Sequence, residues 1–513
     1  AHAQSQYQAQ CHRQQGGRGL CRIAALVDVN IRLGPGVAYA RDSFVLKGET
    51  AVVLGHHSES GWWKIVCPER ADGNVCWVSG GSQYTSVSNA GVAESLVAPP
   101  TPIVEPTAEA TAVSDSSASS SAADSTESEG ETANSAMLVV SSPARMVYAD
   151  DGALWTLLIA DTDRVEPVRL VDAEDVVRIL ISPNGRYAAY VTQENSDSTL
   201  HVVELETGAA QTLVDPADLA VMVTDEALIV VMGQVQWLSD SQSLAFNTYA
   251  IDRAGGPGLG SLEDLWTVDL VGTLNGRFPA GEGGGSFAIS ADDVVIMGQT
   301  TAVIRANLDG SKRETVITFD FVNTASEFAF YPWLQWTERG VFATAAISSP
   351  EPYTSATADL WRIPVTGKAE SLSTLEGNVI FSPIIWSDSG RQLGYIRELM
   401  GQDAALIIGT GDGETMISYA DNANRFFAWS PAESHFVYAG RGAYAIGQVG
   451  VEPLIVDMAE GRTAVSAQWL NDDAFIIALG NAGNWDFRLQ TIDGPATRLV
   501  SGSSSPVYDI WSP

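Results

Sequence analysis

The chain has 513 residues and carries 62 acidic and 28 basic side chains, which gives a net charge of −34. Such an acidic chain repels phosphate backbones, which argues against nucleic acid as a main partner. Hydrophobic residues make up 45% of the sequence, enough for a sizeable core. No apolar run approaches the ~20 residues of a membrane helix, so we expect no transmembrane segment.

The charge and the cysteines divide the chain unevenly. Residues 1–90 are mildly basic, with 8 basic and 6 acidic side chains, and residues 91–136 hold 8 acidic side chains and no basic one. Small residues at Ala1 and Ala3 fit the end of a signal peptide. All four cysteines precede residue 80 and form two close pairs, Cys11 with Cys21 and Cys67 with Cys76. They predict disulfides in an oxidising compartment, with a zinc site as the alternative.

Residues 1–27 form an N-terminal extension with the Cys11–Cys21 loop, and residues 28–90 are typical of a small β domain. Short apolar alternations in the second segment are separated by turn signals. Four ordered motifs there resemble the bacterial Src-homology-3-like family: Val29–Gly36, Leu46–Glu49, Gly61–Ile65 and Val75–Val78. The sequence departs from the family at Cys76, where a glycine is usual. The resemblance implies a small, strongly bent β-barrel in which a Cys67–Cys76 disulfide clips a hairpin.

The aromatic residues of this domain are the candidate binding residues: Tyr39, Trp62, Trp63 and Trp77. The resemblance implies an aromatic surface that holds cell-wall peptides or other extended ligands. Because side chains alternate across a strand, we expect one of Trp62 and Trp63 to be buried and its neighbour to be more exposed. The alternative is that all four are structural aromatics of a small barrel.

Residues 91–136 are rich in Ser, Thr, Ala, Pro and Glu. A segment of this composition buries too little apolar surface to offset chain entropy, so it predicts a disordered acidic linker. Its many serines and threonines are potential sites of O-glycosylation.

Residues 137–513 repeat a four-strand unit, which indicates an all-β fold with a β-propeller. The equivalent first positions are spaced by 40 to 56 residues: Ile181, Trp237, Ile289, Trp336, Trp386, Trp429, Trp469 and Trp511. Turns such as Trp386–Gly390 resemble the TolB-like repeat family rather than the WD-repeat family. We predict eight blades, with seven as the alternative because the unit at Ile289 is weak.

The two ends of this region predict how the propeller closes. Residues 507–513 supply only the first strand of a unit, and residues 145–171 look like the other three. Sharing one blade between the two ends would remove the open sheet edges. The repeated tryptophans are interpreted as wedges that pack adjacent blades.

Signals for catalysis are few in this sequence, so we expect a protein that is not an enzyme and has no cofactor. There is no Gly-x-Ser-x-Gly elbow, and the propeller region has two histidines, His201 and His435. The runs Gly255–Gly258 and Gly281–Gly285 are interpreted as surface loops. Three acidic pairs are interpreted as turn residues, with calcium binding as the alternative: Asp161 with Asp163, Asp292 with Asp293, and Asp472 with Asp473.

These features together favour a secreted or cell-envelope binding or adaptor protein. The barrel would dock on a cell-wall polymer or peptide, and propeller loops would bind a protein or glycan partner. The loops at residues 249–263 and 348–358 are the best candidates because they interrupt the repeat. The alternatives are a structural component of a surface layer or filament and, less favoured, a propeller enzyme acting on polysaccharide.

Overall fold

A computed structural model gives the fold of the protein. It describes residues 21–26, 29–35, 41–46, 48–57, 62–68, 71, 75–80, 84–88, 144–159, 166–194, 197–223, 228–252, 259–322, 329–338, 341–347, 357–377, 383–399, 403–459, 461–481, 484–502 and 506–513. The predicted boundaries between extension, barrel, linker and propeller all lie outside these residues, as does the predicted linker itself.

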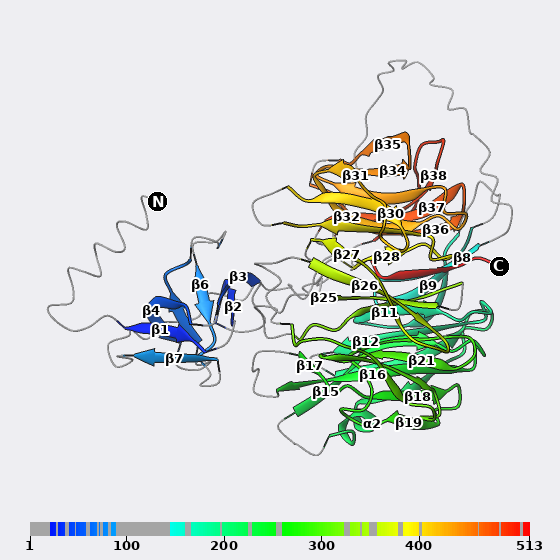
Figure 1. Ribbon diagram of the computed structural model, residues 1–513. Helices are drawn as coiled ribbons and strands as arrows, with labels where there is room; N and C mark the ends of the chain where they lie inside the picture. The colour runs from blue at the N-terminus through cyan, green and yellow to red at the C-terminus, as the bar shows by residue number, and fades with distance from the viewer. Residues whose placement is uncertain are drawn as a thin grey trace, which may run out of the picture.

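The first part of the described chain is a seven-stranded antiparallel sheet with the order β3-β2-β6-β5-β4-β1-β7 (Figure 1). Its strands are β1 (Arg22–Ala25), β2 (Val29–Arg32), β3 (Arg41–Val45), β4 (Thr50–His57), β5 (Trp62–Ile65), β6 (Cys76–Val78) and β7 (Thr85–Ser88). One hydrophobic cluster, which includes Ile23, Val29 and Ile65, forms its core. The Src-homology-3-like assignment of this sheet stays a prediction.

The cysteines of this domain differ from the two predicted pairs. The Cys67–Cys76 disulfide is confirmed. Cys21 is a free thiol, so the predicted Cys11–Cys21 bond is not formed, and Cys11 itself lies outside the described residues. Cys21 is buried in the same hydrophobic cluster as Ile23 and Cys76, and burial raises the pKa of its thiol.

Among the described residues between 144 and 511, the strands form seven four-stranded sheets and one five-stranded sheet. The first three are β10-β9-β8-β40, β11 to β14, and the five-stranded sheet of β15 to β19. Their strands are β8 (Ala144–Asp150), β9 (Ala153–Ile159), β10 (Val168–Asp172), β11 (Val176–Ile181), β12 (Tyr187–Glu194), β13 (Asp197–Glu204), β14 (Ala210–Val214), β15 (Leu228–Trp237), β16 (Ser243–Asp252), β17 (Leu259–Ser261), β18 (Leu265–Asp269), β19 (Leu274–Phe278) and β40 (Tyr508–Trp511).

The other five sheets take their strands in simple chain order. They comprise β20 (Ser286–Ile289), β21 (Val294–Gly298), β22 (Ala302–Asn307), β23 (Glu314–Thr318); β24 (Trp333–Thr337), β25 (Val341–Ile347), β26 (Thr357–Pro364), β27 (Glu370–Glu376); β28 (Ile385–Trp386), β29 (Gln392–Arg397), β30 (Ala405–Thr410), β31 (Met416–Asp421); β32 (Ala423–Trp429), β33 (Phe436–Gly440), β34 (Ala443–Gln448), β35 (Val451–Asp457); and β36 (Thr463–Asn471), β37 (Ala474–Asn481), β38 (Asn484–Thr491), β39 (Thr497–Gly502).

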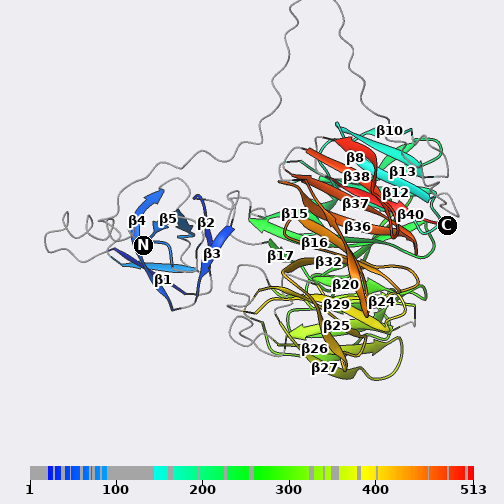
Figure 2. The ribbon, with the colours of Figure 1, turned by 90° about the horizontal axis from the view of Figure 1, so that it is seen from above.

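These sheets pack side by side in chain order, as Figures 1 and 2 show. Each hydrophobic cluster of this region joins residues of two consecutive sheets, and one cluster joins the β36–β39 sheet to the sheet of β8 to β10. The first strands of consecutive sheets contact one another, for example β32 with β36 and β36 with β40. The ring is therefore closed, and the fold is an all-β propeller. Its one described helix is the short α2 (Pro216–Ala220).

The closing sheet combines the two ends of the region, as the sequence predicts. Strand β40 pairs antiparallel with β8, with Tyr508 opposite Tyr148 and Trp511 opposite Arg145. The edge of β8 that would otherwise be open is thereby covered.

Repeat tryptophans pack against the neighbouring sheet, which confirms their role as wedges. The indole of Trp237 donates to the carbonyl of Leu180 at 2.9 Å, and that of Trp429 donates to Ile385 at 3.1 Å. Each bond crosses from one first strand to the first strand of the preceding sheet. The buried rings thus find an acceptor for their N–H groups.

Glutamine side chains add a second set of bonds between first strands. The amide of Gln335 donates to the carbonyl of Trp386 at 2.8 Å and accepts from the same residue's N–H at 3.0 Å. Gln234 makes the same pair of bonds with Phe287, and Gln236 makes it with Ile289. Each side chain therefore acts as an extra rung that fixes the register of two sheets.

No helix in the described part of the chain is long and apolar enough to cross a membrane.

Candidate functional site

The aromatic residues predicted to bind a ligand are buried where the structure describes them. Exposure is 4% for Trp62, 9% for Trp63 and 2% for Trp77, and Tyr39 lies outside the described residues. The expectation that Trp62 or Trp63 is exposed is therefore wrong. Trp63 packs in the core of the N-terminal sheet and against the ring of His56, with 4.1 Å between ring centroids. The three described tryptophans are thus buried in this domain, and their role in binding stays a prediction.

The histidines of the propeller have structural surroundings. His201 stacks on Tyr190 at 4.8 Å between centroids, and its two ring nitrogens face the hydroxyls of Thr192 and Thr212. Burial lowers the pKa of His201. Within the described residues, no three His, Cys, Asp or Glu side chains are grouped so that they could hold a metal ion.

The glycine run Gly281–Gly285 is a surface loop only in part. Gly283, Gly284 and Gly285 are buried, which corrects the prediction for those positions. A Cβ atom at Gly283 would lie 2.4 Å from the main chain of Asp264, and one at Gly285 would lie 2.3 Å from the ring of Tyr331. These glycines are needed because two other segments approach the backbone closely. The run Gly255–Gly258 lies outside the described residues.

The two predicted binding loops are described only in part. In the loop at residues 249–263, strand β17 pairs with β16 and makes that sheet five-stranded. Residues 253–258 and 348–356 lie outside the described chain. Of the acidic pairs, Asp292–Asp293 and Asp472–Asp473 occupy turns between the first two strands of their sheets, and Asp161 and Asp163 are not described.

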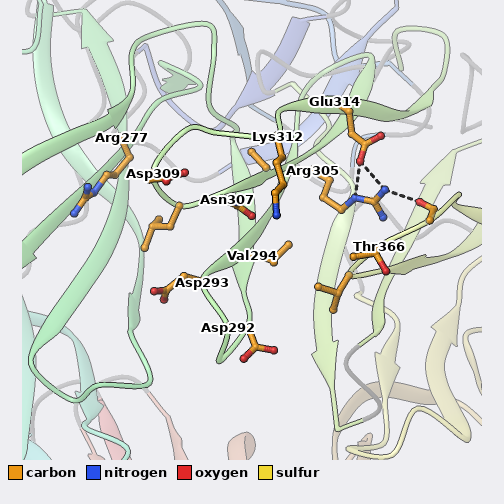
Figure 3. A pocket seen from close by; sticks show the side chains of 14 residues that line it. Arg277, Asp292, Asp293, Val294, Arg305, Asn307, Asp309, Lys312, Glu314 and Thr366 are labelled. Atoms are coloured by element: carbon orange, nitrogen blue, oxygen red, sulfur yellow. Dashed lines mark hydrogen bonds and ion pairs between the residues drawn. The ribbon is translucent and has the colours of Figure 1, made fainter.

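A pocket of about 610 Å³ opens at the turns of the β20–β23 sheet and is the candidate functional site (Figure 3). Three sheets contribute to it: β19 supplies Arg277, the β20–β23 sheet supplies most of the lining, and the turn after β26 supplies Val365–Gly367. Seven of the lining side chains are ionisable: Arg277, Asp292, Asp293, Arg305, Asp309, Lys312 and Glu314.

The acidic end of the pocket is the turn between β20 and β21. The buried hydroxyl of Ser290 accepts hydrogen bonds from the N–H groups of Asp292 at 3.3 Å and Val294 at 3.1 Å. Asp293 has the left-handed φ of 57° that such a tight turn needs. The turn therefore presents two adjacent carboxylates on a fixed backbone.

The turn between β22 and β23 presents charges of both signs. Hydrogen bonds from Ser311, one of them from its N–H at 2.8 Å, lower the pKa of Asp309 and keep it ionised. Lys312 follows Gly310, and both have positive φ values. In Figure 3 the side chain of Lys312 extends into the pocket between Asn307 and Arg305.

Arg305 is the structural support of the pocket. Its side chain is only 6% exposed and donates to the carboxylate of Glu314 at 2.7 Å and 3.0 Å. It also donates to the carbonyls of Pro364 and Gly367 in the next sheet. Because its donors are used in this way, Arg305 holds the far wall in place and is not available to a ligand.

Among the remaining charges of the pocket, Lys312 lies near Asp309 and helps to lower the pKa of that carboxyl. Arg277 donates to the hydroxyl of Thr267 at 2.8 Å. In the described chain, neither Arg277 nor Lys312 forms an ion pair with Asp292 or Asp293. The pocket thus combines two acidic groups at one end with two cations elsewhere in its wall, all open to a ligand.

The pocket lies outside the two loops that the sequence favours for binding. Of its charged residues, the sequence points only to the acidic pair Asp292–Asp293, as possible calcium ligands. Arg277, Lys312 and Val365–Gly367 belong to three different repeat units. One signal is present in the sequence: turns between strands one and two and between strands three and four fall at the same end of an antiparallel sheet. Charges in both turns of one unit, as in Asp292–Lys312, therefore converge.

Comparison with known proteins places the chain by fold alone. No protein-family profile matches the sequence, and no curated protein matches it. Similar solved structures include the Dos1 propeller, at 10% identity over 64% of this chain and 85% of that chain, with a TM-score of 0.47. A eukaryotic initiation factor matches at 10% identity over 72% and 98%, with a TM-score of 0.43. TolB from Acinetobacter baumannii matches at 11% identity over 72% and 66%, with a TM-score of 0.32.

Proposed function

We propose that this protein is an extracytoplasmic adaptor whose propeller binds a polypeptide partner in the pocket at the turns of the β20–β23 sheet. The observation that carries the proposal is that Arg277 and Lys312 face the same pocket as Asp292 and Asp293 and, within the described residues, form no ion pair with them. A cationic ligand group is expected beside Asp292 and Asp293, and an anionic group beside Lys312 and Arg277.

A polypeptide fits these charges better than a glycan. The pocket volume of about 610 Å³ lies in the range of ligand sites, and none of the described residues that line it has an aromatic ring for stacking on a sugar. In an extended peptide, side chains two residues apart lie on the same face about 7 Å apart. A Lys-x-Glu segment can therefore offer both charges at once.

The proposed location and the role of the N-terminal sheet rest on other observations. The Cys67–Cys76 disulfide supports an oxidising compartment outside the cytoplasm. The resemblance to Src-homology-3-like domains supports docking of this sheet on a cell-wall polymer or peptide. Retention of the full chain by purified peptidoglycan tests the docking. Catalysis is not part of the proposal, and an assay for reducing ends released from polysaccharides tests that point.

We also propose that the ring is an eight-bladed propeller of the TolB-like type. All eight first positions of the repeat, from Ile181 to Trp511, fall in separate sheets, and the five-stranded sheet packs between its neighbours as the others do. Strand β17 is then an addition to one blade. Averaged cryo-electron microscopy views along the ring axis count the blades directly.

Fluorescence anisotropy of short labelled peptides tests the proposed site in the full chain. The probe is a five-residue peptide with a central Lys-Ser-Glu, and the control peptide replaces both charged residues by serine. Lys312→Gln and Asp292→Asn are each expected to weaken probe binding about fivefold at low salt, since an exposed charge pair contributes roughly 1 kcal/mol.

The matched control is Arg498→Gln on β39, which removes an exposed cation far from the pocket. It is expected to leave binding unchanged. Equal binding of the probe and the serine peptide, or equal effects of all three substitutions, would contradict the proposed site.

A further inference from the structure

A second pocket lies one sheet further along the same end of the propeller. It has a volume of about 230 Å³ and is lined by the β24–β27 and β28–β31 sheets. Its ionisable lining residues are Arg362 on β26, Arg391 in the turn after β28, and Asp412 in the turn after β30. Like the first pocket, it is formed by turns between strands one and two and between strands three and four.

The two pockets share one wall, the segment that ends β26 and turns into β27. Arg362 lines the second pocket, and Val365–Gly367 of the same segment lines the first. Arg305 donates to the carbonyls of Pro364 and Gly367 and so fixes this wall from the side of the first pocket. The two pockets therefore lie on either side of the β24–β27 sheet.

The outer side of the second pocket is also fixed. The hydroxyl of Ser373 on β27 donates to the carbonyl of Asp412 at 2.7 Å. Gly413 has a φ of 73°, and a Cβ atom there would lie 2.2 Å from the same hydroxyl. The two sheets therefore meet closely here, and the pocket does not depend on a loose loop.

The charges of the second pocket leave a cation open to a ligand. Asp412 accepts from the hydroxyl of Thr410 at 2.6 Å and the N–H of Glu414 at 3.1 Å, and these bonds lower its pKa. Arg362 is paired with Glu370 at the surface. Arg391 is exposed and, although its charge helps to lower the pKa of Glu433, it forms no ion pair within the described residues, so its guanidinium can donate to a ligand carboxylate.

We infer that the two pockets form one track that binds a single extended polypeptide across neighbouring sheets. A Lys-x-Glu segment occupies the first pocket, and a second ligand carboxylate binds Arg391 in the second. This inference rests on the proposed function of the first pocket. Because packed sheets lie about 10 Å apart, and further apart toward the rim, roughly four to six extended residues separate the two binding groups.

Two peptides test the track in the full chain. The short probe is the five-residue Lys-Ser-Glu peptide, and the long probe extends it by a five-residue Gly/Ser spacer and a second glutamate. Joining two binding groups raises the effective concentration of the second to roughly millimolar, so the long probe is expected to bind about tenfold more tightly. A matched long peptide with serine in place of the second glutamate is expected to show no gain.

Substitutions separate the track from the first pocket. Arg391→Gln is expected to remove most of the gain of the long probe while leaving binding of the short probe unchanged. Because the guanidinium of Arg391 makes no ion pair within the described chain, this change should not unfold the protein, and Arg391→Lys should retain part of the gain. Arg498→Gln serves as the control, as before.

The two proposals fail in different ways. If the long probe keeps its full gain in Arg391→Gln, or the gain is the same for a spacer of one residue, the track is wrong and the first pocket stands. If Lys312→Gln affects neither peptide, the proposed function itself is wrong.

Discussion

Asp509 makes the stability of the closing sheet depend on pH. This residue lies on β40, and its carboxylate accepts a hydrogen bond from the N–H of Ile181 on β11 at 2.7 Å. Burial raises its pKa from 3.8 to about 6, against the opposing effect of its hydrogen bonds to backbone N–H groups. The charged form is thus less favoured in the folded protein than in the unfolded chain.

The sign of the effect follows from proton binding. Between pH 4 and pH 6 the folded state binds more protons at Asp509 than the unfolded state, so stability falls as pH rises. The contribution is fully present below about pH 4 and is lost as pH rises through about 6. A shift of about 2 pH units corresponds to about 3 kcal/mol. Because the side chain is partly exposed, we expect about 1–2 kcal/mol.

Asp509→Asn removes the charge and keeps an oxygen that accepts from Ile181. The variant is expected to match the natural protein near pH 3 and to exceed its free energy of unfolding by about 1–2 kcal/mol near pH 7.5. Urea unfolding followed by tryptophan fluorescence at several pH values measures the difference. Other titrating groups cancel because both proteins contain them.

The matched control is Asp240→Asn in the turn after β15, where the carboxylate accepts from Gln242 and Ser243 at the surface. The changes in the free energy of unfolding that the two substitutions produce are compared at each pH. The reasoning about Asp509 is refuted if Asp509→Asn is the less stable protein near pH 7.5, or if its difference is the same at every pH.

Three further predictions concern packing and the disulfide. Gly285→Ala places a Cβ atom 2.3 Å from the ring of Tyr331 and should cost about 1–3 kcal/mol in thermal unfolding, whereas Gly260→Ala, with nothing within 4 Å, should cost far less. Gln335→Ala removes both rungs to the next sheet and should cost about 1–3 kcal/mol by urea unfolding; no change would show that the rungs add nothing. Reduction of the Cys67–Cys76 disulfide should destabilise the N-terminal sheet by about 2–3 kcal/mol, measured as its melting temperature with and without reductant, and an unchanged transition would contradict this.

The ring could be predicted from the sequence because its signal is periodic. The repeat that runs from Ile181 to Trp511 places one strand end in each sheet, and the incomplete units at 145–171 and 507–513 predict the pairing of β8 with β40. Burial of Trp62 and Trp63 could not be predicted in this way. Alternation assigns the two side chains to opposite faces of a strand but does not say which faces are open to water.

The candidate site was missed for a related reason. Its cations, Arg277 and Lys312, come from different repeat units, and each looks like an ordinary surface charge. The order of sheets around the ring brings Arg277 beside this site, whereas Lys312 belongs to the same sheet as Asp292. Similarly, glycine composition predicts a loop at Gly281–Gly285, whereas the burial of its second half depends on Tyr331, a residue of the next unit.

The pairing of β40 with β8 has a consequence for how the ring assembles. Tyr508 pairs with Tyr148, 360 residues earlier in the chain, whereas most sheets are built from strands adjacent in sequence. Closing a segment of this length costs on the order of 5 kcal/mol in chain entropy. We therefore expect the local sheets to form first and the ring to close last, so that β40 acts as a latch. Release of β40 would open the ring into a row of sheets whose two end sheets are unpacked, with the edge of β8 unpaired. Strands of another molecule could pair with that edge, so this open form is the one most prone to aggregation.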